Sequence, residues 1–335
     1  MAAASRDEGW AFGREIGKNE YFILRRHGAT WERAETLHSE KGTEFANTQM
    51  DASGPANVWM FASEFESAGE DTLTRSIALR WDGSGWQPVP VDFSVLDTAV
   101  LAPDDVWVLE ATESPVARHW DGTRWTRHRL PGPAAALSAS GPDDIWAVGS
   151  RTGQPAISHF DGEEWRTVTA PEQDGQAELT EVVAGSREDA WAFGSRRSTA
   201  DGAGSAPRGS AFALHWDGTR WREAPEALDR STDIRPFPTM AAAPDGAGGF
   251  VLGGGQHHTT DDGAHRIEGP KQITGRSAKG AKVDQRRPFE PSELQLVPGT
   301  REIWAVGDVS LAHSGKAGSK RGVVASYSGP ERYHR

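Results

Sequence analysis

Three acidic residues and one histidine are the side chains of this sequence best suited to acid–base chemistry. Asp51, Asp97 and Glu181 each precede a tryptophan by eight to ten residues, and His38 lies upstream of Asp51. Carboxylates held close together have perturbed pKa values and serve as acids, bases or metal ligands. A site built on them would be the centre of a hydrolase, lyase or cyclase. The alternative, which we favour, is that they are hydrated liners of a channel.

A second group resembles metal ligands. His257 and His258 are adjacent, and His265 follows after two aspartates. Neighbouring side chains of a strand point to opposite faces, so only a loop would gather these histidines around one ion. We therefore expect no cofactor, with a metal at these histidines as the alternative.

A repeated motif indicates which elements position these residues. It reads Asp-Asp-Val-Trp-Val-Leu at 104–109, Asp-Asp-Ile-Trp-Ala-Val-Gly at 143–149, Glu-Asp-Ala-Trp-Ala-Phe-Gly at 188–194 and Arg-Glu-Ile-Trp-Ala-Val-Gly at 301–307. Looser copies contain Trp10, Trp59 and Phe250, which makes seven. The intervals of 39 to 59 residues match a four-stranded propeller blade.

A second motif follows the first. It reads His-Trp-Asp-Gly-Thr-Arg-Trp at 119–125 and 215–221, and His-Phe-Asp-Gly-Glu-Glu-Trp at 159–165, with variants at 25–31 and 80–86. Asp-Gly between two apolar stretches predicts a hairpin, because the turn needs a positive φ. All 14 tryptophans fall in the two motifs, so we interpret them as packing between blades. The repeated His119, His159 and His215 are accordingly scaffold residues.

The sequence therefore predicts one all-β domain, a seven-bladed β-propeller of four-stranded antiparallel blades. We place the blades at 1–47, 48–94, 95–134, 135–178, 179–238, 239–292 and 293–335. The chain would start on the inner strand of blade 1 and end near the outer strand of blade 7, and blade 6 lacks a clear Asp-Gly hairpin. Since side chains alternate along a strand, the polar positions of the inner strands should face the channel, with Asp51, Asp97 and Glu181 near one mouth.

The two motifs together resemble the tryptophan-rich propeller repeats of bacterial proteins, which are similar to kelch and Asp-box propellers. The resemblance covers nearly the whole chain and implies the fold. It departs from the Asp-box, which separates Asp from Gly by one residue, and from the glycine doublet of kelch blades. It implies no catalytic residues, and a propeller fold does not fix a function.

The connections between strands indicate where a partner would bind. The turns from the first strand to the second and from the third to the fourth are short and alike, whereas the second-to-third (B–C) and blade-to-blade (D–A) connections are long and variable. Binding residues concentrate on variable loops over a rigid scaffold. We therefore predict a non-catalytic scaffold that binds a protein or other macromolecule through the B–C/D–A face. The candidate binding residues are Lys271, Arg276, Lys279, Lys282, Arg286, Arg287, Lys316, Lys320, Arg321, Glu64 and Glu66.

Composition limits the remaining classes. The net charge of −12 argues against a nucleic-acid partner, because phosphate binding needs a positive surface. The sequence has no apolar run long enough to span a membrane and no cysteine. Its first residues lack the basic and apolar regions of a signal peptide. We expect a cytoplasmic protein, with a secreted protein whose signal peptide has been removed as the alternative.

Overall fold

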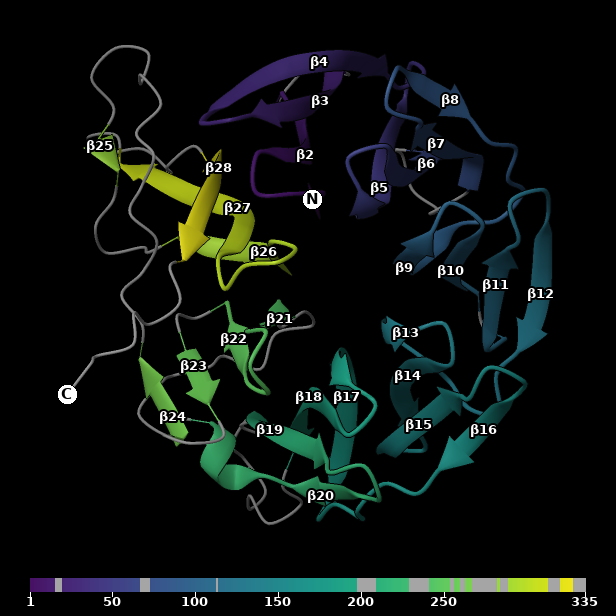
Figure 1. Cartoon of the computed structure of the whole chain (residues 1–335), viewed down its shortest axis with the longest axis vertical. Helices are drawn as coiled ribbons and strands as arrows, with labels where there is room; N and C mark the ends of the chain where they lie inside the picture. Colours follow the sequence, from purple (N-terminus) through teal and green to yellow (C-terminus); the bar gives the residue numbers. More distant parts are fainter. Residues whose placement is uncertain are drawn as a thin grey trace.

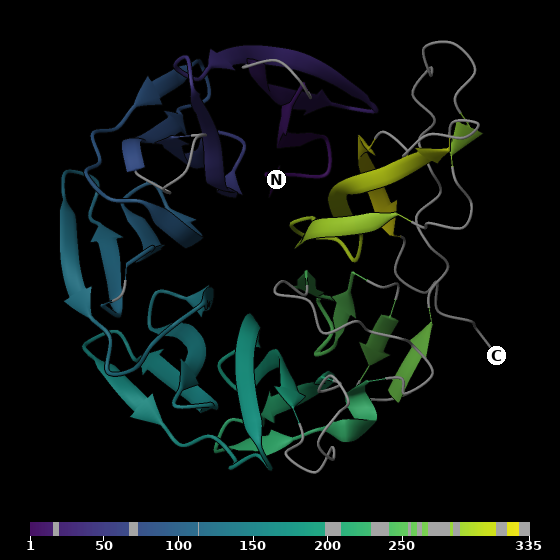
Figure 2. The same cartoon turned by 180° about the vertical axis from the view of Figure 1, so that it is seen from behind.

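The computed structural model shows seven antiparallel sheets arranged radially around a central channel (Figures 1 and 2). It describes residues 1–15, 20–66, 73–112, 114–197, 209–228, 241–253, 256–259, 263–266, 282–283, 289–312 and 320–327. In blades 1 to 6 the first strand faces the channel and later strands lie progressively further out, whereas in blade 7 the strand at the channel is β26 (Glu290–Leu296) and β25 (Lys282–Val283) lies outside (Figure 1). The fold predicted from the repeats, a seven-bladed β-propeller, is confirmed.

Blades 1 to 3 use the first twelve strands. They are β1 (Ala2–Ala3), β2 (Glu8–Arg14), β3 (Glu20–His27) and β4 (Thr30–His38); β5 (Thr43–Gly54), β6 (Asn57–Glu66), β7 (Leu73–Trp81) and β8 (Trp86–Pro88); and β9 (Val95–Ala102), β10 (Asp105–Glu110), β11 (Val116–Trp120) and β12 (Trp125–Arg129). Within each blade, consecutive strands pair antiparallel. β5 begins at Thr43, a few residues before the boundary that the repeats suggested.

Blades 4 to 7 use the remaining strands and one short 3-10 helix. They are β13 (Ala136–Gly141), β14 (Asp144–Arg151), β15 (Gln154–Phe160) and β16 (Trp165–Val168); β17 (Gln176–Ser186), β18 (Asp189–Arg197), β19 (Gly209–Trp216), β20 (Trp221–Glu223) and η1 (Pro225–Ala227); β21 (Ala242–Pro244), β22 (Phe250–Leu252), β23 (Gln256–Thr259) and β24 (Gly263–Arg266); and β25 (Lys282–Val283), β26 (Glu290–Leu296), β27 (Ile303–Ala312) and β28 (Lys320–Tyr327).

Blade 7 differs from the predicted strand order. Its inner strand is β26, which pairs with β27, and β27 pairs with β28. The fourth strand of this sheet is β25, which pairs with the far end of β27. β25 had been assigned to blade 6 by the sequence boundaries, so that assignment was wrong. The outer strand expected near Tyr333 lies outside the described residues.

The Asp-Gly turns form as their sequence predicts. In the hairpin of blade 3, Asp121 Oδ1 accepts hydrogen bonds from the backbone amides of Thr123 and Arg124, both at 2.9 Å. Gly122 has φ of 92°, a conformation that side chains with a Cβ rarely adopt. The two residues together fix the register of β11 and β12, and hence the position of the tryptophan at each end of the turn.

The first-motif aromatic residues occupy equivalent positions between blades. All seven are at most 2% exposed, as predicted. They are Trp10, Trp59, Trp107, Trp146, Trp191, Phe250 and Trp304. In the seam between blades 4 and 5, the ring of Trp146 lies 5.0 Å from that of Trp216 and 5.1 Å from that of Trp221. Each seam of this kind is therefore built from the first motif of one blade and the hairpin of the next.

The ring closes by the same rule. Trp304 of blade 7 packs 6.1 Å from Trp31, the tryptophan that closes the hairpin of blade 1. The Arg26 guanidinium lies 4.1 Å from the centre of the Trp304 ring. The Trp304 ring also lies against Gly9, where any Cβ would collide with it. Blade 1 and blade 7 therefore meet as two separate sheets. Among the described residues, no helix is long and apolar enough to cross a membrane.

Candidate functional site

A pocket of about 590 Å³ lies in the central channel, and the first strands of the blades line it. Its charged lining residues are Asp51, Asp97, Glu181 and Glu293; none of its lining residues is a lysine, arginine or histidine. The three acidic residues found in the sequence thus line one pocket, together with a fourth that sequence reasoning missed.

Asp51 and Asp97 each join two neighbouring blades. Asp51 Oδ1 accepts a hydrogen bond from the amide of the next residue at 2.8 Å, and Oδ2 accepts one from the Val100 amide of blade 3 at 2.7 Å. Asp97 repeats this arrangement, with its Oδ2 2.7 Å from the Leu137 amide of blade 4. Both oxygens of each carboxylate are therefore engaged by backbone amides.

Other polar residues of the inner strands make similar bonds, which we call channel staples. Ser138 Oγ accepts from the Ala184 amide at 3.1 Å, and Gln49 Nε2 donates to the Leu96 carbonyl at 2.7 Å. Gln295 bridges the ring closure, since its Oε1 accepts from the Ala3 amide at 2.7 Å and its Nε2 donates to the Met50 carbonyl at 3.1 Å. The staples connect blade 7 to blades 1 and 2, and they connect blades 2, 3, 4 and 5 in turn.

The pocket raises the pKa of its carboxylates. Burial raises the pKa of Asp51 and of Asp97 to about 7, although the amide donors favour the charged form. Burial and the neighbouring Asp97 and Glu293 carboxylates raise the pKa of Glu181 well above its usual range. The pKa of Glu293 is also raised by burial, and its carboxylate pairs with the N-terminal amine. The channel therefore retains protons near neutral pH.

A longer connection hides Glu293 from sequence analysis. Trp304 pairs with Gln295, nine residues earlier, whereas Trp107 of blade 3 pairs with a residue only eight positions earlier. Counting ten residues back from Trp304 therefore gives Leu294 instead of Glu293. Leu294 is buried, whereas Glu293 lines the pocket. The only sequence signal was an acidic residue one position away from the expected one.

His38 does not belong to this pocket. It ends β4, the outermost strand of blade 1, and its side chain is exposed. The suggestion that His38 completes an acid–base set with Asp51 was therefore wrong. The hairpin that carries β4 places its residues on the outer rim of the ring, away from the inner strands (Figure 1).

The repeated histidines support the sheets. His159 Nε2 lies 2.7 Å from Asp144 Oδ1, and its ring centroid is 4.1 Å from that of Trp146. His119 and His215 make the same contacts in blades 3 and 5. Each of these three blades thus carries a His–Asp pair stacked on its first-motif tryptophan, which is the predicted structural role.

The paired histidines of blade 6 are buried in its sheet. His257 Nε2 lies 2.9 Å from Asp245 Oδ2, while the ring of His258 stacks 5.3 Å from Phe250. The side chain of His265 is not among those described, although its backbone pairs with His257. The described residues contain no group of three side chains arranged to hold a metal ion.

Most of the proposed basic binding residues fall outside the described part of the chain. These are Lys271, Arg276, Lys279, Arg286, Arg287 and Lys316. Lys282, Lys320 and Arg321 are described only as backbone positions in β25 and β28. Of the two acidic candidates, Glu66 is exposed at the end of β6.

Glu64 is not available to a partner. Its side chain is completely buried and accepts hydrogen bonds from Thr43 Oγ1, from the Glu40 amide at 2.6 Å and from Arg75 at 2.9 Å. These donors hold the pKa of Glu64 below its usual range against the opposing effect of desolvation. The choice of Glu64 as a binding residue was therefore wrong. The residue lies within β6 and not in the connection that follows this strand.

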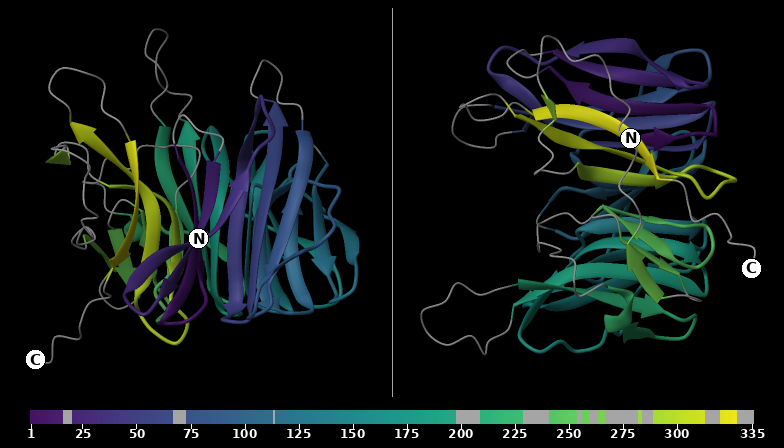
Figure 3. Two further views of the ribbon diagram at one scale, coloured as in Figure 1. Left: turned by 90° about the horizontal axis from the view of Figure 1, so that it is seen from above. Right: turned by 90° about the vertical axis from the view of Figure 1, so that its left-hand side faces the viewer.

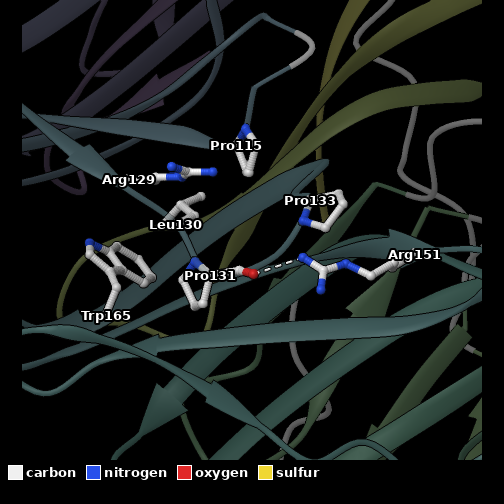
Figure 4. A pocket seen from close by; sticks show the side chains of 7 residues that line it. All are labelled: Pro115, Arg129, Leu130, Pro131, Pro133, Arg151 and Trp165. Atoms are coloured by element: carbon white, nitrogen blue, oxygen red, sulfur yellow. Dashed lines mark hydrogen bonds between the residues drawn. The ribbon is translucent and has the colours of Figure 1, made fainter.

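A smaller cleft of about 370 Å³ lies at the outer part of the seam between blades 3 and 4 (Figure 4). Pro115 comes from the B–C connection of blade 3, and Leu130, Pro131 and Pro133 come from the D–A connection that follows β12. Arg151 Nη2 donates to the Pro131 carbonyl at 2.8 Å across this cleft (Figure 4). The lining is completed by Arg129 and Trp165. Sequence analysis did not single out this cleft.

Comparison with known proteins adds little beyond the fold. No protein-family model matches the chain, and no curated protein matches it. Among solved structures, the chain is similar to YCF48 from Cyanidioschyzon merolae, with a TM-score of 0.47, 12% identity and coverage of 97% of this chain and 96% of that one. It is also similar to a structure of YCF48 bound to D1 peptide, with a TM-score of 0.42, 14% identity and coverage of 85% and 86%.

A third similar structure is the β-propeller domain of Cps50 (Swd1) from Myceliophteria thermophila. The TM-score is 0.45, the identity 11%, and the coverage 97% of this chain and 98% of that one. These levels of similarity are too low to transfer a ligand or an activity. The sheets of the chain itself establish its seven-bladed architecture.

Proposed function

We propose that this protein is a non-catalytic scaffold that binds a partner protein on its B–C/D–A face. The observation that carries the proposal is that both oxygens of Asp51 and of Asp97 are engaged by backbone amides, one from the same strand and one from the neighbouring blade. These two carboxylates thus connect the blades, which supports binding as the role of the variable face. The structural role of His119, His159 and His215 points in the same direction.

The partner would dock over blade 7 and extend toward blades 1 and 2. The support for this location is sequence alone, since the lysines and arginines near blade 7 contrast with a net charge of −12. Such a patch attracts an acidic partner, and the attraction weakens with salt over a Debye length of about 8–10 Å.

The test replaces Lys279, Lys282, Arg286 and Arg287 with serine and measures partner capture from the host at low and at moderate salt. The matched control replaces Arg6, Arg124, Arg220 and Arg301, which are exposed on the turns of the opposite face, and so removes the same charge. We expect the first variant to lose capture at low salt and the control to retain it. Equal capture by both variants at both salts contradicts the proposed face.

An enzyme with its site in the channel is the second candidate. Glu181 favours it, because this carboxylate has a raised pKa and its side chain makes no hydrogen bond to a described residue. A general acid of this kind would protonate a leaving group near neutral pH. Glu181→Gln separates the two functions: it should leave partner capture unchanged, whereas it would abolish turnover of any substrate found for the channel.

A further inference from the structure

We propose that the cleft between blades 3 and 4 binds an extended segment of a partner protein in which a carboxylate side chain stands beside an apolar one. This proposal rests on the scaffold function proposed above and names one contact that a partner would make.

Arg151 has an equivalent in blade 5 that already holds a carboxylate. Arg151 and Arg196 each follow the first-motif tryptophan of their blade by five residues. Arg196 Nη1 donates to Glu223 Oε1 at 2.8 Å and to Gln173 Oε1 at 3.2 Å. Arg151, by contrast, donates to a backbone carbonyl, and it has no carboxylate partner among the described residues. The guanidinium is therefore positioned by one hydrogen bond while its other donors remain available.

The missing carboxylate has an identifiable origin. Glu223 stands two residues after Trp221, and the residue two positions after Trp165 in blade 4 is Thr167. The registers agree, since Glu223 pairs with Leu214 and Thr167 pairs with Ser158. Blade 4 thus lacks the acidic side chain that neutralises the arginine in blade 5. A carboxylate from a ligand would supply it.

The D–A connection at the cleft has no counterpart of the side chains that neighbouring connections place beside an arginine. Between blades 2 and 3, the D–A connection inserts Phe93, which is buried beneath the Arg118 guanidinium at 4.3 Å. Between blades 4 and 5, it inserts Gln173, whose backbone and side chain bond to Gln154 and Arg196. Between blades 3 and 4, the connection buries Leu130 in the seam and places Pro131 and Pro133 beside Arg151.

These prolines make the cleft rigid and apolar. Pro115, Pro131 and Pro133 line it together with the edge of Trp165 (Figure 4). Proline fixes its own φ, so little conformational entropy is lost when a ligand binds there. Arg129 adds a second exposed guanidinium on the other side of Leu130. The combination of an apolar floor and two cations suits an acidic residue next to a leucine or an aromatic residue.

The test uses fluorescein-labelled octapeptides in which Asp, Asn or Lys stands beside Leu or Phe, with binding followed by fluorescence anisotropy. We expect Asp peptides to bind about tenfold more tightly than their Asn counterparts, because a charge-assisted hydrogen bond is lost with Asn. Arg151→Ser should remove this preference. Arg196→Ser is the matched control and should retain it, because that arginine is already paired within blade 5.

A second variant guards against a general loss of structure. Thr167→Glu keeps both cleft arginines but supplies the carboxylate that blade 5 has, so it should also abolish the preference for Asp. The proposal is overturned if Arg151→Ser and Thr167→Glu still prefer the Asp peptides. It is also overturned if the parent protein binds the Asp and Asn peptides equally well. Failure here with intact partner capture through blade 7 would leave the scaffold function standing, so the two failures are distinguishable.

Discussion

The seams from blade 1 to blade 5 differ in construction from the seam between blades 6 and 7. In the first group, a buried tryptophan meets the aromatic pair of the next hairpin, as Trp59 meets Trp120 and Trp125 at 5.7 and 5.8 Å. Between blades 6 and 7, the buried cluster consists mainly of small aliphatic residues such as Ala243, Val251 and Ala305. Less apolar area is buried in that seam, so it contributes less to stability.

Strand length follows the same division. The strands of blade 6 contain 3, 3, 4 and 4 residues, whereas β17, β18 and β19 of blade 5 contain 11, 9 and 8. The channel staples connect blade 7 to blades 1 and 2 and then blades 2 to 5 in turn, and thus hold the arc with the long strands. We infer that the closed ring tolerates the short strands of blade 6 because hydrogen bonds of the channel staples connect the other blades to one another.

The largest effect is expected from removing a tryptophan of a seam between blades. Trp146→Ala should lower the free energy of unfolding by about 3–5 kcal/mol, because it opens a cavity between blades 4 and 5. Urea denaturation measures the change. Arg166→Ala, an exposed neighbour in β16, is the control and should change stability by less than about 0.5 kcal/mol. A loss for Trp146→Ala no larger than that of the control would show that the seam is not a core.

Hydrogen exchange compares the local stability of blade 6 with that of blade 4 in the intact protein. Amides of β22 and β23 should exchange through openings that cost about 2 kcal/mol less than those of β14 and β15, a factor of about 30 in protection. The physical reason is the smaller number of ladder hydrogen bonds and the smaller aromatic contacts of blade 6. Equal protection of the two blades, measured by mass spectrometry at neutral pH, would mean that the ring opens as a single unit.

The repeats predicted most of the fold because they are local. Each Asp-Gly turn fixes a hairpin, and each tryptophan marks one position in a blade, so Trp107 and Trp125 could be placed without knowing the ring. The channel carboxylates Asp51, Asp97 and Glu181 could be placed by counting from those tryptophans. Glu293 could not, because the connection between the paired positions of β26 and β27 is one residue longer than in blades 3 and 5.

Contacts between blades could not be read from the sequence. Whether Glu64 is exposed depends on Thr43, Glu40 and Arg75 folding over it. The cleft beside Arg151 depends on the absence of side chains that other blades insert there. Each is a relation between residues in different strands, and periodicity within one strand carries no information about it.

The contribution of a His–Asp pair can be measured by comparing His159 of blade 4 with the residue at the matched position of blade 7. His159→Ala should destabilise the protein by about 1–2 kcal/mol, because it leaves the buried Asp144 carboxylate with fewer donors and uncovers Trp146. The matched position in blade 7 is Ser326, which pairs with Trp304. Ser326→Ala should cost less than about 0.5 kcal/mol. Similar costs at the two positions, measured by thermal denaturation, would mean that the histidine adds nothing to the sheet.

The channel predicts a pH dependence, because burial raises the pKa of Asp97 although two amide donors oppose the shift. A carboxyl group whose pKa rises from 3.8 to about 7 on folding binds its proton more tightly in the folded state, as Asp97 does. Its contribution to stability is complete below pH 4 and is lost as the pH rises toward 7. Asp97→Asn removes the titrating group, so the stability of the parent relative to this variant should decrease between pH 4 and 7. Asp121→Asn is the control: the Thr123 hydroxyl and the hairpin amides lower the pKa of Asp121, so its contribution should stay nearly constant over that range. A relative stability of parent and Asp97→Asn that is constant or rises with pH would show that the channel does not retain the proton.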